Sequence, residues 1–420
     1  MRPPFAGTGD RENGDRQQRP LPTRWLVLGV FVLSSALNYL DRLLVPALAP
    51  RLKAEFQLSN ADYGLVLAAF SVVYAACAPF AGWFIDRVGL NRGISLAVGF
   101  WSLAAMSIGL TGGLAGLMLC YAVLGLAQAG GIPASGKAVA LYLKPRERAL
   151  GSAVSQVGLS LGAMLAPPLG VYLAVRYGWR WAFVAAGAAG LLWIPVWNRV
   201  ARAVPSPAPR GEVPRGAGGV LRDRRLWGFV AANVLSMTVY TLWSNWTMVF
   251  LVQAHSLSLS QSAWLAWMPP VAANLGGLFG GWLSLRWISG GAGAVPARLR
   301  ACFVAALALL VTAAVPWMPG AAWATAGICL SYFWVVAFSV NLYAMPLDVW
   351  GAAHAAFATS MLTSAYGAMQ AVFSPLAGAL IDRWGFQPVC ALVAGLPLGA
   401  YGVLRLALGG ESGVRSQDSE

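Results

Sequence analysis

Long apolar segments recur through almost the whole chain, and they constrain its fold more than any other feature. Most of them reach the length of about 20 residues that a helix needs to cross a bilayer. Of the 420 residues, 58% are hydrophobic and 10% are charged, against roughly a quarter charged in an ordinary soluble domain. A water-soluble fold could not bury so much apolar surface. The chain is therefore predicted to be an all-α membrane protein.

The apolar segments predict twelve transmembrane helices separated by short polar turns. They lie at residues 24–49, 61–85, 93–112, 114–142, 149–174, 180–198, 227–252, 263–285, 298–317, 321–346, 352–381 and 387–408.

A segment rich in Pro, Gly and Arg follows the sixth span and reads as a flexible linker between two six-helix halves. The predicted organisation is a tail at 1–23, an N-terminal bundle at 24–198, a linker at 199–226, a C-terminal bundle at 227–408 and a tail at 409–420. The tails are too short to form a folded soluble domain. Related sequences end corresponding spans in the two halves, and such internal repeats are typical of secondary transporters.

The net charge of +14 is concentrated in the N-terminal tail, the linker and alternate short loops. This distribution follows the positive-inside rule and places both termini in the cytosol, so it predicts orientation rather than a nucleic-acid surface. The N-terminal tail is polar and Arg-rich, and the first apolar run is too long for a secretory signal. The arginine-rich composition suggests a bacterial inner membrane.

The sequence offers no signal for enzyme chemistry. The five cysteines lie inside apolar segments without paired spacing, and His255 and His354 are far apart. There is no phosphate-binding glycine loop and no nucleophile–histidine pair. We therefore predict no enzyme activity, cofactor or metal, and transport that runs on an existing gradient.

A charged turn follows the second span and is a candidate gate. It contains Gly82, Asp86, Arg87, Gly89 and Arg92 in the pattern G-x-x-x-D-R-x-G-x-x-R. Gly82 allows helices to approach closely, and Asp86 can meet a neighbouring helix N-terminus or an arginine when the inward gate is shut. A solvated charge cluster is the alternative. In the second half a leucine occupies the acidic position, so the corresponding gate contact should be weaker there.

Asp41 and Arg42 are adjacent charges inside the first apolar span. An uncompensated charge in a membrane helix is costly, so a functional role is the default interpretation. A guanidinium binds a carboxylate through two parallel hydrogen bonds, and a desolvated carboxyl can carry a proton. A structural pair that joins the first span to its neighbours is the alternative.

Other polar and aromatic residues in the spans could line a cavity or join helices to one another. They are Tyr39, Tyr74, Gln156, Ser160, Tyr240, Trp243, Asn245, Asn341 and Gln370. Two small-residue motifs predict close helix packing, Gly158 with Gly162 and Gly277 with Gly281. Lys137 is expected to extend to the membrane interface.

The charged turn resembles the signature of the major facilitator superfamily. More narrowly, nearly the whole chain resembles the anion:cation symporter family, which includes hexuronate and galactonate permeases. The matching motifs are Asn38–Arg42 (NYLDR), Phe70–Tyr74 (FSVVY), Gly125–Lys137 (GLAQAGGIPASGK), Pro145–Ala149 (PRERA), Ala166–Leu169 (APPL), Gly178–Arg180 (GWR), Leu265–Pro269 (LAWMP), Gly280–Ser284 (GGWLS) and Asn341–Asp348 (NLYAMPLD). This resemblance implies a proton-coupling role for Asp41 and a carboxylate anchor at Arg42.

The fourth span departs from the family pattern, which has an arginine and, seven residues later, a glutamate that resembles a second proton-coupling group. Tyr121 and Gln128 occupy these positions. In the eighth span Asn274 stands where an acid is common. Gln128 does not titrate, so coupling rests on Asp41 alone, or the protein is a uniporter or exchanger.

We therefore predict a secondary transporter that moves a small organic anion, a carboxylate such as a sugar acid, by alternating access with proton coupling. The predicted binding residues are Arg42, Tyr39, Tyr74, Tyr121, Gln128, Gln156, Asn341 and Gln370. The expected partners are this substrate, the proton and the bilayer, with the chain as a monomer. The alternatives are a uniporter or exchanger, an exporter of another solute, and a non-transporting sensor. The Ala166-Pro167-Pro168 sequence resembles importers more than exporters.

Overall fold

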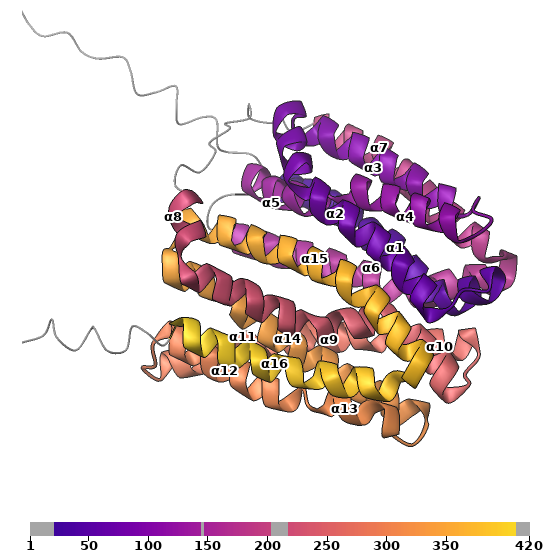
Figure 1. The fold of residues 1–420 in the computed structure, drawn as a ribbon. Coiled ribbons are helices and arrows are strands. Elements are labelled where there is room, and N and C mark those ends of the chain that lie inside the picture. The colour runs from indigo at the N-terminus through magenta and orange to yellow at the C-terminus, as the bar shows by residue number, and fades with distance from the viewer. Residues whose placement is uncertain (1–20, 144–146, 203–216, 409–420) are drawn as a thin grey trace, which may run out of the picture.

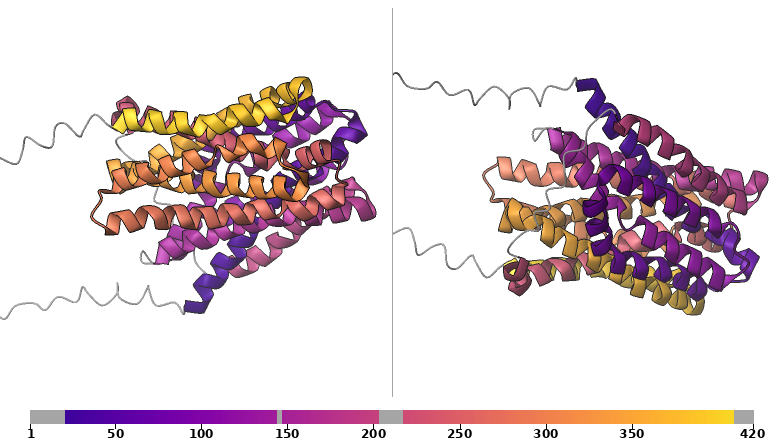
Figure 2. Two further views of the ribbon diagram at one scale, coloured as in Figure 1. Left: turned by 90° about the horizontal axis from the view of Figure 1, so that it is seen from below. Right: turned by 90° about the horizontal axis from the view of Figure 1, so that it is seen from above.

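The computed structural model describes residues 21–143, 147–202 and 217–408. Within these ranges the chain consists of helices joined by short turns, without a strand. Figures 1 and 2 show the helices running roughly along one direction in a single bundle. Eight of the described helices are long and apolar enough to cross a membrane by length and composition. Each predicted span coincides with one helix or with consecutive shorter helices, so the all-α membrane fold is confirmed and the described helices agree with twelve spans.

The described part of the N-terminal half contains seven helices. They are α1 (Leu21–Phe56), α2 (Asn60–Val88), α3 (Leu90–Ile108), α4 (Leu114–Gln128), α5 (Gly131–Tyr142), α6 (Arg148–Tyr177) and α7 (Trp179–Arg202).

The fourth span was predicted as one helix but is divided into α4 and α5. Ala129 and Gly130 separate the two pieces, and the N–H of Ala129 bonds to Leu126 O one residue short of the α-helical partner. The sequence Gly130-Gly131 followed by Pro133 disfavours an uninterrupted helix, because glycine costs backbone entropy and proline lacks an N–H.

The C-terminal half begins with a short helix and continues through the last six spans. Its elements are α8 (Ala217–Arg222), α9 (Arg224–His255), α10 (Leu259–Ala266), α11 (Met268–Ser289), α12 (Ala294–Ala308), α13 (Val311–Ala314), a 3₁₀ turn (Val315–Trp317), α14 (Gly320–Trp350), α15 (Ala352–Trp384) and α16 (Phe386–Leu408). The eighth span is divided at Trp267, because Pro269 and Pro270 cannot continue the hydrogen-bond ladder of α10.

The structure describes both ends of the linker predicted at 199–226, and both ends are helical. The helix α7 continues to Arg202 and α8 covers Ala217–Arg222, and residues 203–216 lie outside the described ranges. Asp223 then caps α9 by accepting a hydrogen bond from the backbone N–H of Arg225 at 2.8 Å. The tails at 1–20 and 409–420 also lie outside the described ranges.

Two tight reversals in the N-terminal half depend on glycine. Gly89 joins α2 to α3 with a φ of 89°, and Gly178 joins α6 to α7 with a φ of 96°. Other residues adopt such angles at a cost. At the start of α2, Ser59 and Asp62 form a reciprocal capping box. These turns define the two ends of the bundle, which we call the Ser59 end and the Gly89 end.

Glycines bring helices of each half into backbone contact. In the N-terminal half α6 packs along α1. A Cβ atom at Gly158 would stand 2.7 Å from Val32 O, and one at Gly162 would clash with Ala36 O. The close-packing role predicted for these two residues agrees with this geometry.

The second predicted glycine motif was wrong by one residue. The glycines of α11 that meet the backbone of α14 are Gly276, against Phe333 O, and Gly280, against Ala337. A Cβ at Gly281 would have no atom within 4 Å. The run Gly276-Gly277 and Gly280-Gly281 offers two overlapping registers, and the sequence alone does not show which one faces α14.

The two halves touch closely at the Ser59 end, where α15 packs along α2 (Figure 1). The carboxylate of Asp382 on α15 accepts hydrogen bonds from the backbone N–H groups of Asn60 at 3.0 Å and Ala61 at 2.8 Å. This contact places a negative charge at the N-terminus of α2. Nearby, the Tyr63 hydroxyl donates to Asn245 O at 2.8 Å. Side chains of both halves therefore close this end.

Candidate functional site

A cavity of about 620 Å³ lies between the two halves. Helices α1 to α6 form one wall, and α9, α11, α14 and α15 form the other. Its lining continues toward the Gly89 end, where Ser135 of α5 and Ser152 of α6 contribute. Because the halves meet at the Ser59 end, the cavity extends toward the opposite end of the bundle.

Six of the predicted binding residues line this cavity. They are Tyr39, Arg42, Tyr74, Tyr121, Gln156 and Gln370. The first five come from the N-terminal half and Gln370 comes from α15 of the other half. Residues that are far apart in the sequence are therefore brought to one chamber.

Arg42 is the charged residue in the described cavity lining. Its Nε donates to Gln128 Oε1 at 3.2 Å. The guanidinium carbon lies 5.1 Å from the ring centre of Tyr39, 4.9 Å from that of Phe70 and 4.6 Å from that of Tyr74. These distances are those of cation–π contacts. Among the described residues, Arg42 forms no ion pair with a carboxylate.

Gln128 and Tyr121, which replace the charged residues of the family pattern, hold the Arg42 segment from α4. The amide of Gln128 donates to Asn38 O at 3.0 Å while its carbonyl accepts from Arg42. The Tyr121 hydroxyl donates to the backbone carbonyl of Arg42 at 2.8 Å. Both side chains are buried. The α4 face thus fixes α1 through neutral groups, and no carboxylate of the described residues pairs with the guanidinium.

Asp41 is adjacent to Arg42 but lies in a different environment. Its side chain is 0% exposed, and neither carboxyl oxygen has a hydrogen-bond partner among the described residues. It does not contribute to the lining of the cavity. Successive residues of a helix point about 100° apart, so one residue faces the chamber while its neighbour is enclosed by protein.

Asn341 was predicted to bind substrate, and the structure places it outside the cavity lining. It is buried on α14, and its amide donates to Gly280 O and to Ala337 O, both at 2.9 Å. The bond to Gly280 O joins α14 to α11 where glycines bring the two backbones together, and the bond to Ala337 O lies within α14. The position therefore serves helix packing.

A family model described as the Major Facilitator Superfamily matches residues 31–363 of this chain. The chain belongs to the Major Facilitator Superfamily. It is a secondary transporter and not an enzyme. The predicted resemblance is confirmed.

Among curated relatives, the chain is 28% identical to the hexuronate transporter of Escherichia coli K12 over 397 residues, which cover 88% of this chain and 90% of that protein. It is 26% identical to a probable sulfoacetate transporter of Cupriavidus necator over 418 residues, covering 95% and 97%. A solved structure of a bacterial homologue of the human lysosomal transporter Spinster, in an inward-facing and occupied conformation, superposes with a TM-score of 0.73 at 19% identity, covering 93% and 96%. This likeness supports the major facilitator fold.

The C-terminal half gives this major facilitator protein a neutral polar wall that the sequence revealed only in part. Tyr240 and Asn245 were candidates and do line the cavity from this half, whereas Tyr343 and Tyr366 were not singled out. The candidate Ser160 also lines the cavity, from α6 of the N-terminal half. Tyr343 lies within the matched Asn341–Asp348 motif, which could have indicated it. Tyr366 lies in an apolar stretch of α15 without any motif.

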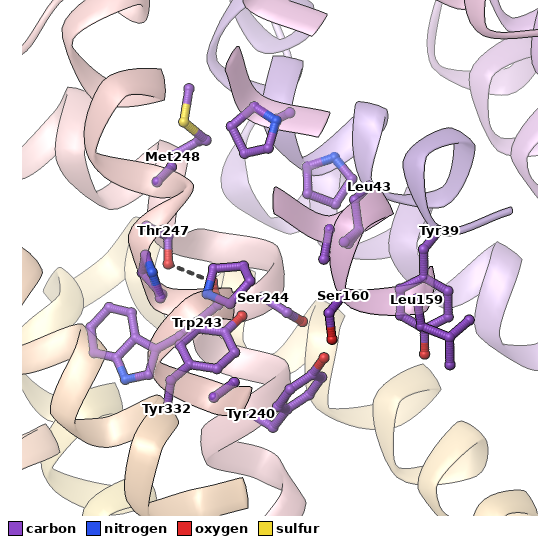
Figure 3. Close-up of a pocket in the computed structure, with 18 of the residues that line it drawn as sticks. Tyr39, Leu43, Leu159, Ser160, Tyr240, Trp243, Ser244, Thr247, Met248 and Tyr332 are labelled. Carbon is purple, nitrogen blue, oxygen red and sulfur yellow. Dashed lines mark hydrogen bonds between the residues drawn. The ribbon is translucent and has the colours of Figure 1, made fainter. Parts of the chain in front are cut away.

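A smaller chamber of about 120 Å³ adjoins the cavity toward the Ser59 end. Figure 3 shows the hydroxyl groups of Ser160, Tyr240 and Ser244 pointing toward one another at this chamber. Ser160 also donates to Asn274 Oδ1 at 2.7 Å and thereby joins α6 to α11. The two halves thus meet through neutral hydroxyl and amide groups beside the cavity.

The predicted gate lies at the Gly89 end, and the structure describes part of it. Gly89 forms the tight turn between α2 and α3, and the side chains of Arg87 and Arg92 are exposed. The packing around Gly82 and the side chain of Asp86 lie outside what the structure describes. Lys137 was expected to extend to the membrane interface; its Nζ donates to Ile85 O at 3.2 Å, near the end of α2.

Proposed function

We propose that this protein carries a small organic anion, a carboxylate such as a sugar acid, across the membrane by alternating access. The observation that supports this proposal is Arg42, a cation that faces a 620 Å³ cavity between the halves without an opposing carboxylate among the described residues. A guanidinium in this setting favours an anionic ligand and can bind a carboxylate through two hydrogen bonds. Hexuronates, the substrates in the name of one relative, carry such a group.

The proposed cycle follows from which end of the bundle is closed. In this conformation Asp382 and Tyr63 join the halves at the Ser59 end, and the cavity lining extends toward the Gly89 end. If the Gly89 end faces the cytosol, as the charge distribution predicts, this is the inward-facing state. Rocking of the halves would open the Ser59 end and expose Arg42 to the other side.

We further propose that Asp41 couples transport to protons. Its buried carboxyl has no hydrogen-bond partner among the described residues, and an ionised carboxylate in such a place is costly. A proton on Asp41 removes that cost in this conformation. Release of the proton requires a state in which water reaches the side chain, so protonation and the position of the halves are linked.

Uniport or substrate exchange is the second candidate, and one observation favours it. The group that contacts Arg42 Nε is the amide of Gln128, which binds no proton. Binding of the anion therefore need not displace an acidic partner from the arginine. In that case substrate would move down its own gradient.

The experiment that tests the proposal is uptake into proteoliposomes of the purified full chain. Radiolabelled D-galacturonate and D-galactonate would be compared with the uncharged polyol galactitol, with and without an imposed pH gradient. We expect uptake of at least one acid and none of galactitol, with stimulation when the outside is acidic. Acid uptake that ignores the gradient selects uniport or exchange. Equal uptake of acids and galactitol contradicts anion transport.

Orientation is a separate proposal with its own test. Single cysteines would replace Leu110 near the Ser59 end and Ala292 near the Gly89 end in a cysteine-free background. In bacterial cells a membrane-impermeant thiol reagent should label position 110 and not position 292. The reverse pattern would place the Gly89 end outside and contradict the cytosolic termini.

A further inference from the structure

We propose that the cavity selects organic anions with a single negative charge and discriminates against those with two. This inference rests on the proposed function and specifies its substrate class. The two relatives leave the point open, because a hexuronate carries one carboxylate whereas sulfoacetate carries a carboxylate and a sulfonate. The charges around the cavity favour ligands with one negative charge over ligands with two.

The described residues that line the cavity supply one cation and no anion. Arg42 is that cation; the others are aliphatic, aromatic, amide, hydroxyl, methionine and glycine residues. The adjoining small chamber is lined by uncharged residues throughout its described part. Asp41, the neighbouring ionisable group, is enclosed and can contribute only a negative charge or none.

The groups around Arg42 leave its positive charge available to one anionic group of the ligand. The aromatic rings of Tyr39, Phe70 and Tyr74 stand around the guanidinium within about 5 Å. The Nε is engaged by the neutral Gln128. One carboxylate can therefore approach a cation that pairs with no carboxylate of the described residues. A second anionic group on the same molecule would have to share the Arg42 cation or lie in the uncharged part of the cavity.

The opposite wall offers a second anionic group hydrogen bonds but no charge. Tyr240, Tyr343, Tyr366 and Gln370 face the cavity from the C-terminal half, and Ser160 and Ser244 stand at the entrance to the small chamber (Figure 3). Such groups suit the hydroxyls of a sugar chain or an uncharged ring. An ionised group that leaves water without a cation to meet it is strongly disfavoured.

The test uses one carbon skeleton with zero, one or two charges. Galactitol, D-galactonate and galactarate share a six-carbon chain and differ only in how many ends are carboxylates. Binding of each to the detergent-purified full chain would be measured by calorimetry at pH 7.5. Benzoate and terephthalate form a second pair, with an aromatic skeleton, for the case in which hexonates do not fit the cavity.

We expect a monoacid to bind at least about tenfold more tightly than the diacid of the same skeleton, with no binding of galactitol. Diacid affinity within about threefold of the monoacid in either pair would overturn the inference while leaving anion transport standing. If no acid binds better than galactitol, the proposed function fails, and this inference fails with it. The two failures are thus distinguishable.

Charge variants sharpen the test. Gln128→Glu places a carboxylate beside Arg42 Nε and should weaken monoacid binding at least about tenfold at pH 7.5. The matched control is Gln261→Glu, in the capping box that begins α10, far from the cavity lining. It should change nothing. Unaltered monoacid binding in Gln128→Glu would contradict the assignment of the Arg42 charge to the ligand.

A second cation should relax the selectivity. Tyr121→Arg or Gln156→Arg adds a positive charge to the cavity wall on α4 or α6, so the ratio of monoacid to diacid affinity should fall by at least about threefold. Two variants on different helices are used because either change could disturb folding, which elution of a single symmetric peak would check. If both fold and neither lowers the ratio, charge does not set the selectivity.

Discussion

The two halves of this transporter contribute unlike walls to one cavity. The N-terminal half supplies Arg42 and encloses Asp41 beside it, whereas the C-terminal half supplies tyrosine hydroxyls and amides. Repeated halves of similar architecture therefore divide the chemistry between them. The N-terminal wall can fix the charged end of a ligand, and the C-terminal wall can contact its uncharged remainder.

Glycines bring helices into backbone contact in both halves, and each half adds polar contacts of its own. In the N-terminal half, side chains of α4 tie α1 in place through Tyr121 and Gln128. In the C-terminal half, α11 and α14 meet through Gly276 and Gly280, with Asn341 bridging their backbones. A neutral wall from one half and a charged wall from the other form a cavity to which both halves contribute.

The largest effect is expected from Gly276→Val, which tests the rigid packing of the C-terminal half. A side chain at Gly276 would collide with Phe333 O, so the variant should lose about 1–3 kcal/mol of stability and give much less folded protein. Gly281→Val, on the same helix with open space around it, is the control. Thermal melting of the detergent-purified proteins measures the difference. Equal melting temperatures would show that the contact between α11 and α14 can accommodate a larger side chain.

Asp41→Asn tests whether the N-terminal half holds the coupling proton. The amide cannot ionise, so stimulation of uptake by an acidic exterior should disappear, whereas exchange of labelled against unlabelled substrate should continue. Asp62→Asn, at the exposed capping box of α2, should retain the stimulation. The readout is initial uptake into proteoliposomes at several imposed pH gradients. Persistent stimulation in Asp41→Asn would exclude Asp41 as the coupling site.

Tyr240→Phe tests whether the C-terminal wall contacts the uncharged part of the ligand. Removal of one hydroxyl from the neutral wall should weaken D-galactonate binding by about threefold to tenfold. The ratio of D-galactonate to galactarate affinity should stay the same, because the charge lies on the other wall. A change in that ratio would show that the C-terminal wall also contributes to the selectivity for ligand charge. Calorimetry with both acids provides both numbers.

The smallest effect is expected from Asp382→Asn, which weakens the contact between the halves at the Ser59 end. Loss of the negative charge at the N-terminus of α2 should favour opening of this end by roughly threefold. A cysteine at Ala47, which lines the small chamber, should then react faster with a thiol reagent. An unchanged rate would mean that Asp382 does not hold this end closed.

The sequence predicted the membrane fold well, because hydropathy and helix length are properties of contiguous segments. Asp41 and Arg42 also stood out, since charges in apolar helices are conspicuous. It did not predict that Asp41 would be enclosed while Arg42 faces the cavity, because the rotation of α1 depends on its neighbours. It missed Tyr366 and misplaced the glycine register of α11 for the same reason. The breaks at Gly130 and Trp267 were not predicted, although the Gly-Gly and Pro-Pro sequences there disfavour a continuous helix.

Equilibrium binding of D-galactonate to Arg42→Gln tests the central claim most directly, with Arg405→Gln on α16 as the matched control outside the cavity. If Arg42 anchors the carboxylate, affinity should fall by about 100-fold in Arg42→Gln and stay at the wild-type value in the control. Wild-type affinity in a correctly folded Arg42→Gln protein would contradict the account.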